Sequence, residues 1–204
     1  MAFVDLTHQF KKDMPVFPGD KPPGIREVAN IDNHGYNAFR LDTGMHIGTH
    51  MDAPLHMIQE GKKLNDYPVD TFAGKAVVID MTAKSLATTE MLASVDLSKC
   101  EILLFRSGWS QYFGEEKYYF EYPEISKELA ISLTQSKIRM VGLDWPSPDR
   151  APYEVHRILL GNDILIIENL KSLNLLPANK VFQLYAFPYT YDIEGSPVRV
   201  IAEI

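Results

Sequence analysis

Three of the six histidines of this chain lie within the segment 46–56, together with one aspartate. The histidines are His46, His50 and His56, and the aspartate is Asp52. Imidazole nitrogens and carboxylate oxygens are ligands that zinc, manganese and related divalent ions accept. A thiolate site is excluded because the chain has a single cysteine. The segment therefore predicts a site for a divalent metal ion and a reaction that depends on it.

No regular element brings these four side chains together. On an α-helix, at about 100° per residue, Asp52 would lie roughly 240° around the axis from His46, and Pro54 opposes a continuing helix. In an extended strand, four residues at about 3.3 Å each place the backbones of His46 and His50 roughly 13 Å apart. The strand must therefore bend, and Gly48 can adopt the positive φ that a bend needs. We expect a strand that curls into a metal-binding loop.

Two further candidate ligands lie far along the chain. His156 falls within a predicted helix at 152–160. Glu168 ends a strongly apolar run, and α/β proteins tend to place site residues at the carboxyl ends of buried strands. His8 and His34 have no acidic or histidine neighbours at ligand spacing, so we expect them to be structural or surface residues.

The elements that must position these residues form a mixed pattern of strands and helices. Short β-branched and aromatic runs predict strands at 2–7, 25–30, 36–43, 76–81, 101–106, 138–143, 163–168, 181–187 and 197–203. Capping residues and prolines predict helices at 88–95, 123–136 and 152–160. We find no internal repeat and no long linker. The expected fold is therefore a single α/β domain with a mixed sheet, spanning residues 1–204.

The composition argues against several classes of partner. Lys and Arg number 20 against 27 Asp and Glu, a net charge of -7, and no segment clusters basic residues as phosphate neutralisation requires. Nucleic acid is not an expected partner. The apolar runs fall far short of the 18 or so residues that span a bilayer, so no membrane segment is expected. The N-terminus lacks the features of a signal peptide, and Cys100 reads as a buried, inert thiol, so we expect a cytoplasmic protein.

The motif His46-x-Gly48-Thr49-His50-x-Asp52-x-Pro54-x-His56 resembles the signature of the cyclase-like metal-dependent hydrolases, a family that includes the bacterial kynurenine formamidases. Residues 15–20 resemble the family's N-terminal loop, and residues 144–149 resemble its second polar loop. His156 with Glu168 twelve residues on resembles its downstream pair of ligands. These matches extend from about residue 5 to residue 170.

The resemblance implies a swivelling β/β/α fold and a homodimer or higher oligomer with its sites near the subunit interface. It implies a site for two zinc ions per subunit, with manganese as an alternative, in which Asp52 and Glu168 are candidate bridges. The metal ligands that it implies are His46, His50, Asp52, His156 and Glu168. His56 would be the catalytic acid/base.

The expected reaction is hydrolysis of an amide. A metal-activated water would attack the carbonyl, and His56 would take its proton and pass it to the leaving amine. The resemblance points to an aryl formamide, N-formylkynurenine, as substrate and to tryptophan catabolism as its setting. Phe17 is expected to bind the aryl group, although the formamidases carry a tryptophan there. Trp145 and either Tyr36 or Tyr153 are further expected pocket residues.

Two alternatives remain open from the sequence. A hydrolase that opens a cyclic amide, as an isatin hydrolase does, would use the same metal and the same His56. A catalytically inactive module that only binds metal is the other. A serine hydrolase is disfavoured because the chain lacks the G-x-S-x-G motif.

Overall fold

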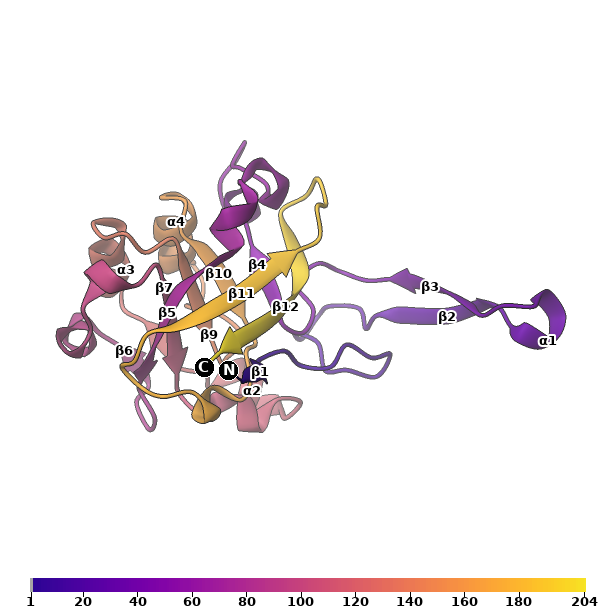
Figure 1. Cartoon of the computed structure of the whole chain (residues 1–204), viewed down its shortest axis with the longest axis horizontal. Coiled ribbons are helices and arrows are strands. Elements are labelled where there is room, and N and C mark those ends of the chain that lie inside the picture. The colour runs from indigo at the N-terminus through magenta and orange to yellow at the C-terminus, as the bar shows by residue number, and fades with distance from the viewer. Residues whose placement is uncertain (1) are drawn as a thin grey trace.

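The computed structural model describes residues 2–204 and is built around one mixed sheet that closes on itself (Figure 1). β12 pairs with β4 as well as with β11, so every strand of the order below except β1 belongs to a closed, barrel-like ring. β5, β7, β9 and β10 run parallel to one another, and the remaining pairs are antiparallel. The strand order is β1 (Phe3–Asp5), β12 (Gly195–Glu203), β11 (Phe182–Pro188), β5 (Ala73–Asp80), β7 (Ile102–Arg106), β9 (Met140–Leu143), β10 (Leu165–Glu168) and β4 (His50–Asp52).

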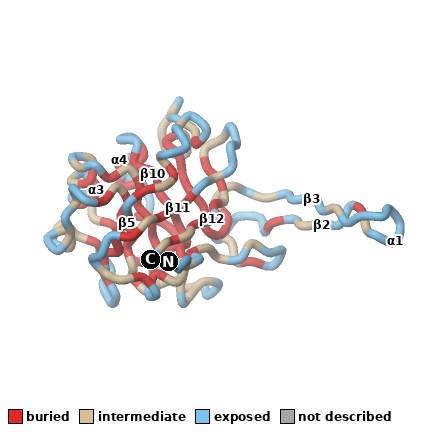
Figure 2. Tube along the Cα trace, in the orientation of Figure 1, coloured by how far each residue is buried: buried red, intermediate tan, exposed pale blue. Residues whose placement is uncertain are grey.

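The parallel strands are buried on both faces, which explains their continuous apolar sequences. Successive side chains point to opposite faces of a strand, and neighbours in β7 accordingly enter different clusters. Leu104 packs in the cluster that also contains residues of β11 and β12, whereas Leu103 packs with α3 (Lys127–Thr134) and α4 (Glu154–Leu160). Figure 2 shows the resulting band of buried residues along the central strands.

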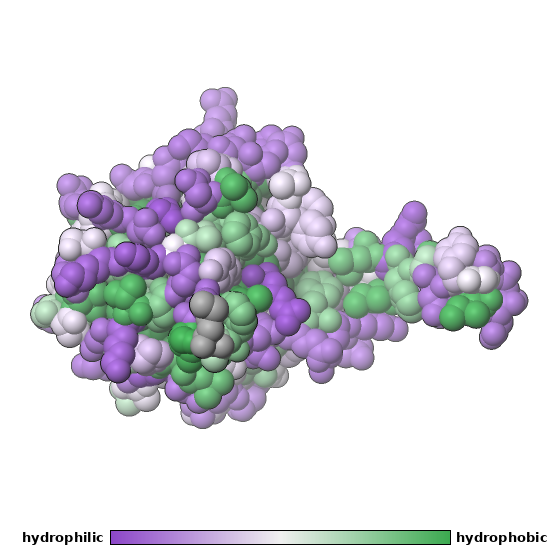
Figure 3. Space-filling model, in the orientation of Figure 1, coloured by the Kyte–Doolittle hydropathy of each residue, from purple (hydrophilic) through white to green (hydrophobic). Residues whose placement is uncertain are grey.

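β2 (Gly24–Ala29), α1 (Ile31–His34) and β3 (Ala38–Asp42) form an arm that projects from the body (Figure 1). The turn is well specified, because Asn30 caps the short helix and Gly35 ends it at a φ of 78°. Most of the arm is solvent-exposed (Figure 2), and it carries large apolar side chains, which appear as green patches along the arm in Figure 3. The arm was predicted as two strands, but the sequence did not show that they stand apart from the main sheet.

The predicted strands are all present, with ends shifted by a few residues, whereas the helices need correction. Residues 89–94 form a 3-10 segment instead of an α-helix. The helix predicted at 123–136 begins only after Ser126, whose side chain caps it, because β8 (Glu124–Ile125) instead pairs with β6 (Leu86–Ala87). α2 (Glu116–Phe120) was not predicted. Within the described residues, no helix is both long enough and apolar enough to cross a bilayer.

Candidate metal centre

The segment that carries the first ligand candidates bends as its spacing requires. Gly48 has a φ of 64°, and a Cβ built there would lie 2.5 Å from the Met14 side chain. The chain then enters β4, which is only three residues long and pairs with both β10 and β12. A 3-10 turn at Pro54–His56 follows, so that His56 returns toward His46. The predicted curl is therefore confirmed in its geometry.

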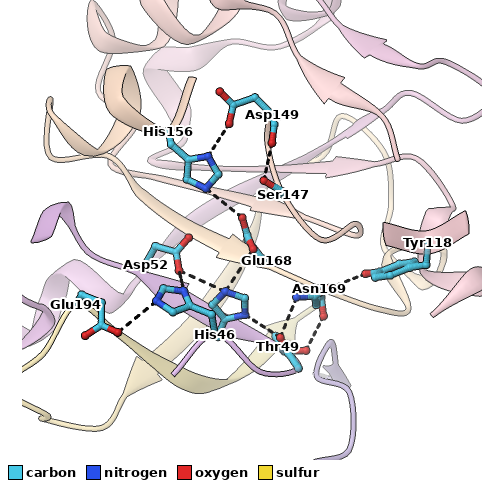
Figure 4. Close-up of polar contacts among 12 residues, drawn as sticks. His46, Thr49, Asp52, Tyr118, Ser147, Asp149, His156, Glu168, Asn169 and Glu194 are labelled. Carbon is cyan, nitrogen blue, oxygen red and sulfur yellow. Dashed lines mark hydrogen bonds and ion pairs between the residues drawn. The ribbon is translucent and has the colours of Figure 1, made fainter. Parts of the chain in front are cut away.

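The sheet register brings the distant candidates to the same place. Glu168 of β10 lies opposite His50 of β4, and the two side chains approach to 3.3 Å between Oε2 and Nε2. His156, from α4, places its Nε2 3.4 Å from the other oxygen of Glu168. Asp52 Oδ1 lies 2.8 Å from His46 Nδ1 and 3.3 Å from His50 Nε2. All five residues named as ligands thus converge on one cluster (Figure 4).

The cluster contains buried polar atoms that lack hydrogen bonds. Within the part of the chain that the structure describes, His46 Nε2, His50 Nε2, Asp52 Oδ1 and Glu168 Oε1 have no hydrogen-bond partner. A buried polar group without a partner is costly, and several in one place call for an ion or a ligand. The two groups of side chains whose ligand atoms lie close enough to share an ion are His46, Asp52 and His56, and His50, Asp52 and Glu168. The donor set of nitrogen and oxygen atoms fits a divalent metal.

The second ring nitrogens are held by protein acceptors. His50 Nδ1 lies 2.8 Å from the carbonyl of Gly48, and His156 Nδ1 lies 2.6 Å from Asp149 Oδ1. A carbonyl or carboxylate at one ring nitrogen fixes the proton there and leaves the other nitrogen free to bind metal. Asp149 was not assigned this role from the sequence, although it lies in the polar loop at 144–149 that resembles the family.

The electrostatics of the cluster favour an ionised carboxylate at Asp52 and a protonated ring at His156. Burial raises the pKa of the Asp52 carboxyl, but the adjacent His46 and His50 outweigh it and hold the pKa well below the usual range. Burial lowers the pKa of His156, but the hydrogen bond to Asp149 and the nearby Glu168 carboxylate reverse this and raise the pKa to about 10. An ion bound at this cluster would have to displace the proton that His156 holds, so its binding would depend on pH.

His56 lies beside the cluster, with its ring close to those of two of its histidines. Its ring centroid is 4.1 Å from that of His46 and 6.0 Å from that of His156. Burial lowers its pKa from 6.5, against the opposing effect of Asp52. A neutral imidazole at this position can accept a proton near neutral pH. Its ligand atoms also lie close to those of His46 and Asp52, so the geometry is compatible with a base and with a ligand.

A cavity of about 320 Å³ opens onto the cluster. Its walls include Phe17 and Tyr153 as expected, and Phe17 packs edge-on against Tyr119, with ring centroids 5.8 Å apart. Of the two alternatives Tyr36 and Tyr153, the structure places Tyr153 in the wall, and Tyr36 lies exposed in the arm. The expectation for Trp145 is wrong, because its side chain is fully buried in the core.

The carboxylate of Asp144, in the polar loop at 144–149, is held by three hydrogen bonds. Its oxygens accept hydrogen bonds from the backbone N–H groups of Ser107 and Gly108 and from the Ser107 hydroxyl. His34 is exposed in the arm, and His8 stacks on Phe113 at 3.9 Å, in keeping with the structural or surface roles expected of them.

The chain is similar over most of its length to proteins of one family. The family described as "Putative cyclase" matches residues 4–150. A kynurenine formamidase of Bacillus mycoides is 28% identical over 98% of this chain and 96% of its own length. One from Geobacillus thermodenitrificans is 29% identical over 97% and 95%. Isatin hydrolase A from Labrenzia aggregata superposes with a TM-score of 0.85 at 26% identity, over 98% of this chain and 93% of its own. The chain therefore belongs to the cyclase family.

Proposed function

We propose that this protein is a metal-dependent hydrolase of aryl amides and that its substrate is N-formylkynurenine. The observation that carries the proposal is the convergence of His46, the β4 and β10 side chains and His156 of α4 at one end of an aromatic cavity, where four buried ring and carboxylate atoms of His46, β4 and β10 lack a hydrogen-bond partner within residues 2–204. In this proposal the metal ligands are His46, His50, Asp52, His156 and Glu168, and the ions are two zinc ions, with manganese as the alternative.

The chemistry divides between the ion and the protein. A bound divalent ion lowers the pKa of a coordinated water toward about 7 and polarises a carbonyl. His56 is the general acid/base: its neutral ring takes a proton from the attacking water and returns it to the leaving amine nitrogen. Asp149 holds the proton on Nδ1 of His156, which keeps that ring in one orientation.

The cavity wall supports an aryl substrate. The cavity is lined by the aromatic residues Phe17, Phe113, Tyr119 and Tyr153, and a flat aromatic ring packs well against such faces. Phe17 and Tyr119 are already packed edge to face, which gives Phe17 a defined position next to the cavity. Kynurenine formamidases of similar sequence over nearly their whole length add weight to the formyl-aryl amide.

A second candidate is the opening of a cyclic aryl amide. It is favoured by the likeness to isatin hydrolase A, whose TM-score of 0.85 spans nearly the whole chain. Both reactions need the same ion, base and aromatic wall, so the substrate alone separates them. Metal retention with no turnover on either substrate would instead indicate an inactive metal-binding module.

The proposal also includes the assembly and setting of the protein. The chain would form a single domain over residues 1–204 with the swivelling β/β/α arrangement, and the lone buried thiol of Cys100 suits the cytoplasm. We propose a homodimer, because an isolated two-stranded hairpin is marginal in water and the arm exposes Ile31, Tyr36 and Phe39.

The deciding experiment combines metal analysis of the purified protein with initial rates on N-formylkynurenine and on isatin. Zinc or manganese bound together with faster turnover of N-formylkynurenine is the expected result. A preference for isatin would favour the second candidate. Protein without metal that gains no activity on addition of zinc or manganese would refute both.

A further inference from the structure

Tyr118 and Asn169 are buried polar residues that lie next to the cluster, with Asn169 beside Thr49 (Figure 4). Tyr118 comes from α2 and is fully buried. Asn169 directly follows Glu168 at the end of β10 and is 7% exposed. A hydrogen bond of 2.8 Å joins the Tyr118 hydroxyl to Asn169 Oδ1. Neither residue belongs to the ligand set proposed above.

The direction of each hydrogen bond that links Tyr118 through Asn169 and Gly48 to His50 follows from which atoms can donate and which can only accept. The Gly48 carbonyl can only accept, and it lies 3.0 Å from Asn169 Nδ2 and 2.8 Å from His50 Nδ1. The amide nitrogen of Asn169 must therefore face Gly48, which turns its oxygen toward Tyr118. The Tyr118 hydroxyl must in turn donate. At the far end, His50 must carry its proton on Nδ1, which leaves Nε2 as the free nitrogen.

A second bond fastens the same two segments. The Thr49 hydroxyl donates to the Asn169 carbonyl at 2.6 Å, beside the ladder pair of Glu168 and His50. Asn169 has a φ of 56°, a left-handed conformation that asparagine tolerates better than most residues. The loop before His50 and the residue after Glu168 are thus joined by side-chain and backbone bonds.

We propose that Tyr118 and Asn169 are positioning residues for the metal centre. They orient the Gly48 carbonyl as the acceptor for the Nδ1 proton of His50, and so present His50 Nε2 to the metal ion. The inference rests on the proposed metal site, but it does not depend on the identity of the substrate.

This relay, the series of hydrogen bonds from Tyr118 through Asn169 and Gly48 to His50, can position the ring because each of its bonds has one direction only. Burial, with Asp144 nearby, keeps the pKa of Tyr118 well above its usual range, so its hydroxyl retains the proton that it donates. Without that donor, Asn169 Oδ1 loses its hydrogen bond, and the amide is held in place only by its bond to the Gly48 carbonyl. The Asn169 side chain is then less firmly fixed against Gly48, and so is the His50 ring that shares this carbonyl.

The test is metal affinity, measured by competition with a chromophoric chelator at a temperature at which every variant is folded. Tyr118→Phe is expected to weaken zinc binding roughly 10- to 100-fold, the range seen when outer contacts of a ligand histidine are lost. Tyr119→Phe is the matched control, because its buried hydroxyl has no hydrogen-bond partner within residues 2–204. Its zinc affinity should be that of the unmodified protein. Equal affinities for the two variants would overturn the proposal.

A double-mutant cycle separates a relay from two independent structural contacts. If Tyr118 acts through Asn169, adding Tyr118→Phe to Asn169→Ala should cost no further zinc affinity. Additive losses would refute the relay. Should Tyr118→Phe fail to fold, nitrogen-15 NMR of the zinc-loaded, histidine-labelled protein decides the question: His50 must carry its proton on Nδ1, and a proton on Nε2 refutes the proposal. If the unmodified protein bound no metal, the proposed function itself would fail.

Discussion

Replacing His56 by alanine separates a proton carrier from a metal ligand. The ring packs on His46, with centroids 4.1 Å apart, and its lowered pKa lies below 6.5. At pH 7.5 more than about 90% of a group with such a pKa is neutral and can accept a proton. General acid/base catalysis contributes about 10²- to 10⁴-fold, or about 2.7 to 5.4 kcal/mol of barrier. We expect His56→Ala to lose that much turnover and to retain its metal.

The assay measures kcat on N-formylkynurenine with zinc in excess and the metal content of the same sample. His46→Ala is the control for a ligand, since His46 lies 2.8 Å from Asp52, and it should lose metal as well as activity. In the unmodified protein, kcat/KM should fall as the pH drops through the lowered pKa of His56, because the base form is then lost. Partial recovery of His56→Ala by added zinc, or near-normal turnover with full metal, would refute the assignment.

Three further outcomes are expected. Burial, aided by Lys171, lowers the pKa of His8 from 6.5 to about 4, so the unfolded chain binds more protons in this window. The contribution of neutral His8 to the free energy of unfolding should be fully present above pH 6.5 and should fall by up to about 3 kcal/mol as the pH drops to 4. Urea unfolding of the protein should show this loss, and His8→Gln should not. Phe17→Ala should raise KM roughly 2- to 12-fold, in line with about 0.5 to 1.5 kcal/mol for an aromatic contact, and leave kcat almost unchanged; a fall in kcat alone would contradict the placement of Phe17. Ile31→Ser combined with Phe39→Ser should yield a monomer in light scattering, and an unchanged mass would exclude the arm as the dimer contact.

The strands could be predicted because burial imposes a local pattern on them. β5, β7, β9 and β10 are parallel and buried on both faces, so each reads as a short apolar run. The α-helix predicted at 88–95 was wrong because the segment at 89–94 buries no residue fully, and so short a helix has little packing to stabilise it. The arm could not be foreseen, because β2 and β3 have ordinary strand sequences and their exposure depends on where the rest of the chain lies.

The candidate site divides in the same way. Residues 46–56 could be identified as a candidate metal site from the sequence, because histidine, a rare residue type, recurs there at short spacing. Asp149 and Asn169 are single polar residues in loops, and neither has a neighbour in sequence that reveals its partner. Their roles emerge only when the pairing of β4 with β10 sets Glu168 beside His50 and α4 brings His156 over it. A register one residue different would turn Glu168 to the other face of the sheet.

The closing strand of the barrel carries two of the proposed ligands, and binding of an ion there would couple the site to the fold. β4 is three residues long and buried throughout, yet it brings His50 and Asp52 into the seam between β10 and β12. Burial of these charged groups opposes closure, and a bound ion offsets that cost.

Removing the metal should therefore loosen the seam before the rest of the sheet. With metal at about 100 times Kd, binding adds about 2.7 kcal/mol of stability, which corresponds to roughly 5–11 °C in Tm for a chain of this size. Hydrogen exchange should show a larger loss of protection in β4 than in β7, which pairs on both sides with parallel neighbours. Equal losses in the two strands, or no change in Tm on chelation, would show that the barrel closes without help from the ion.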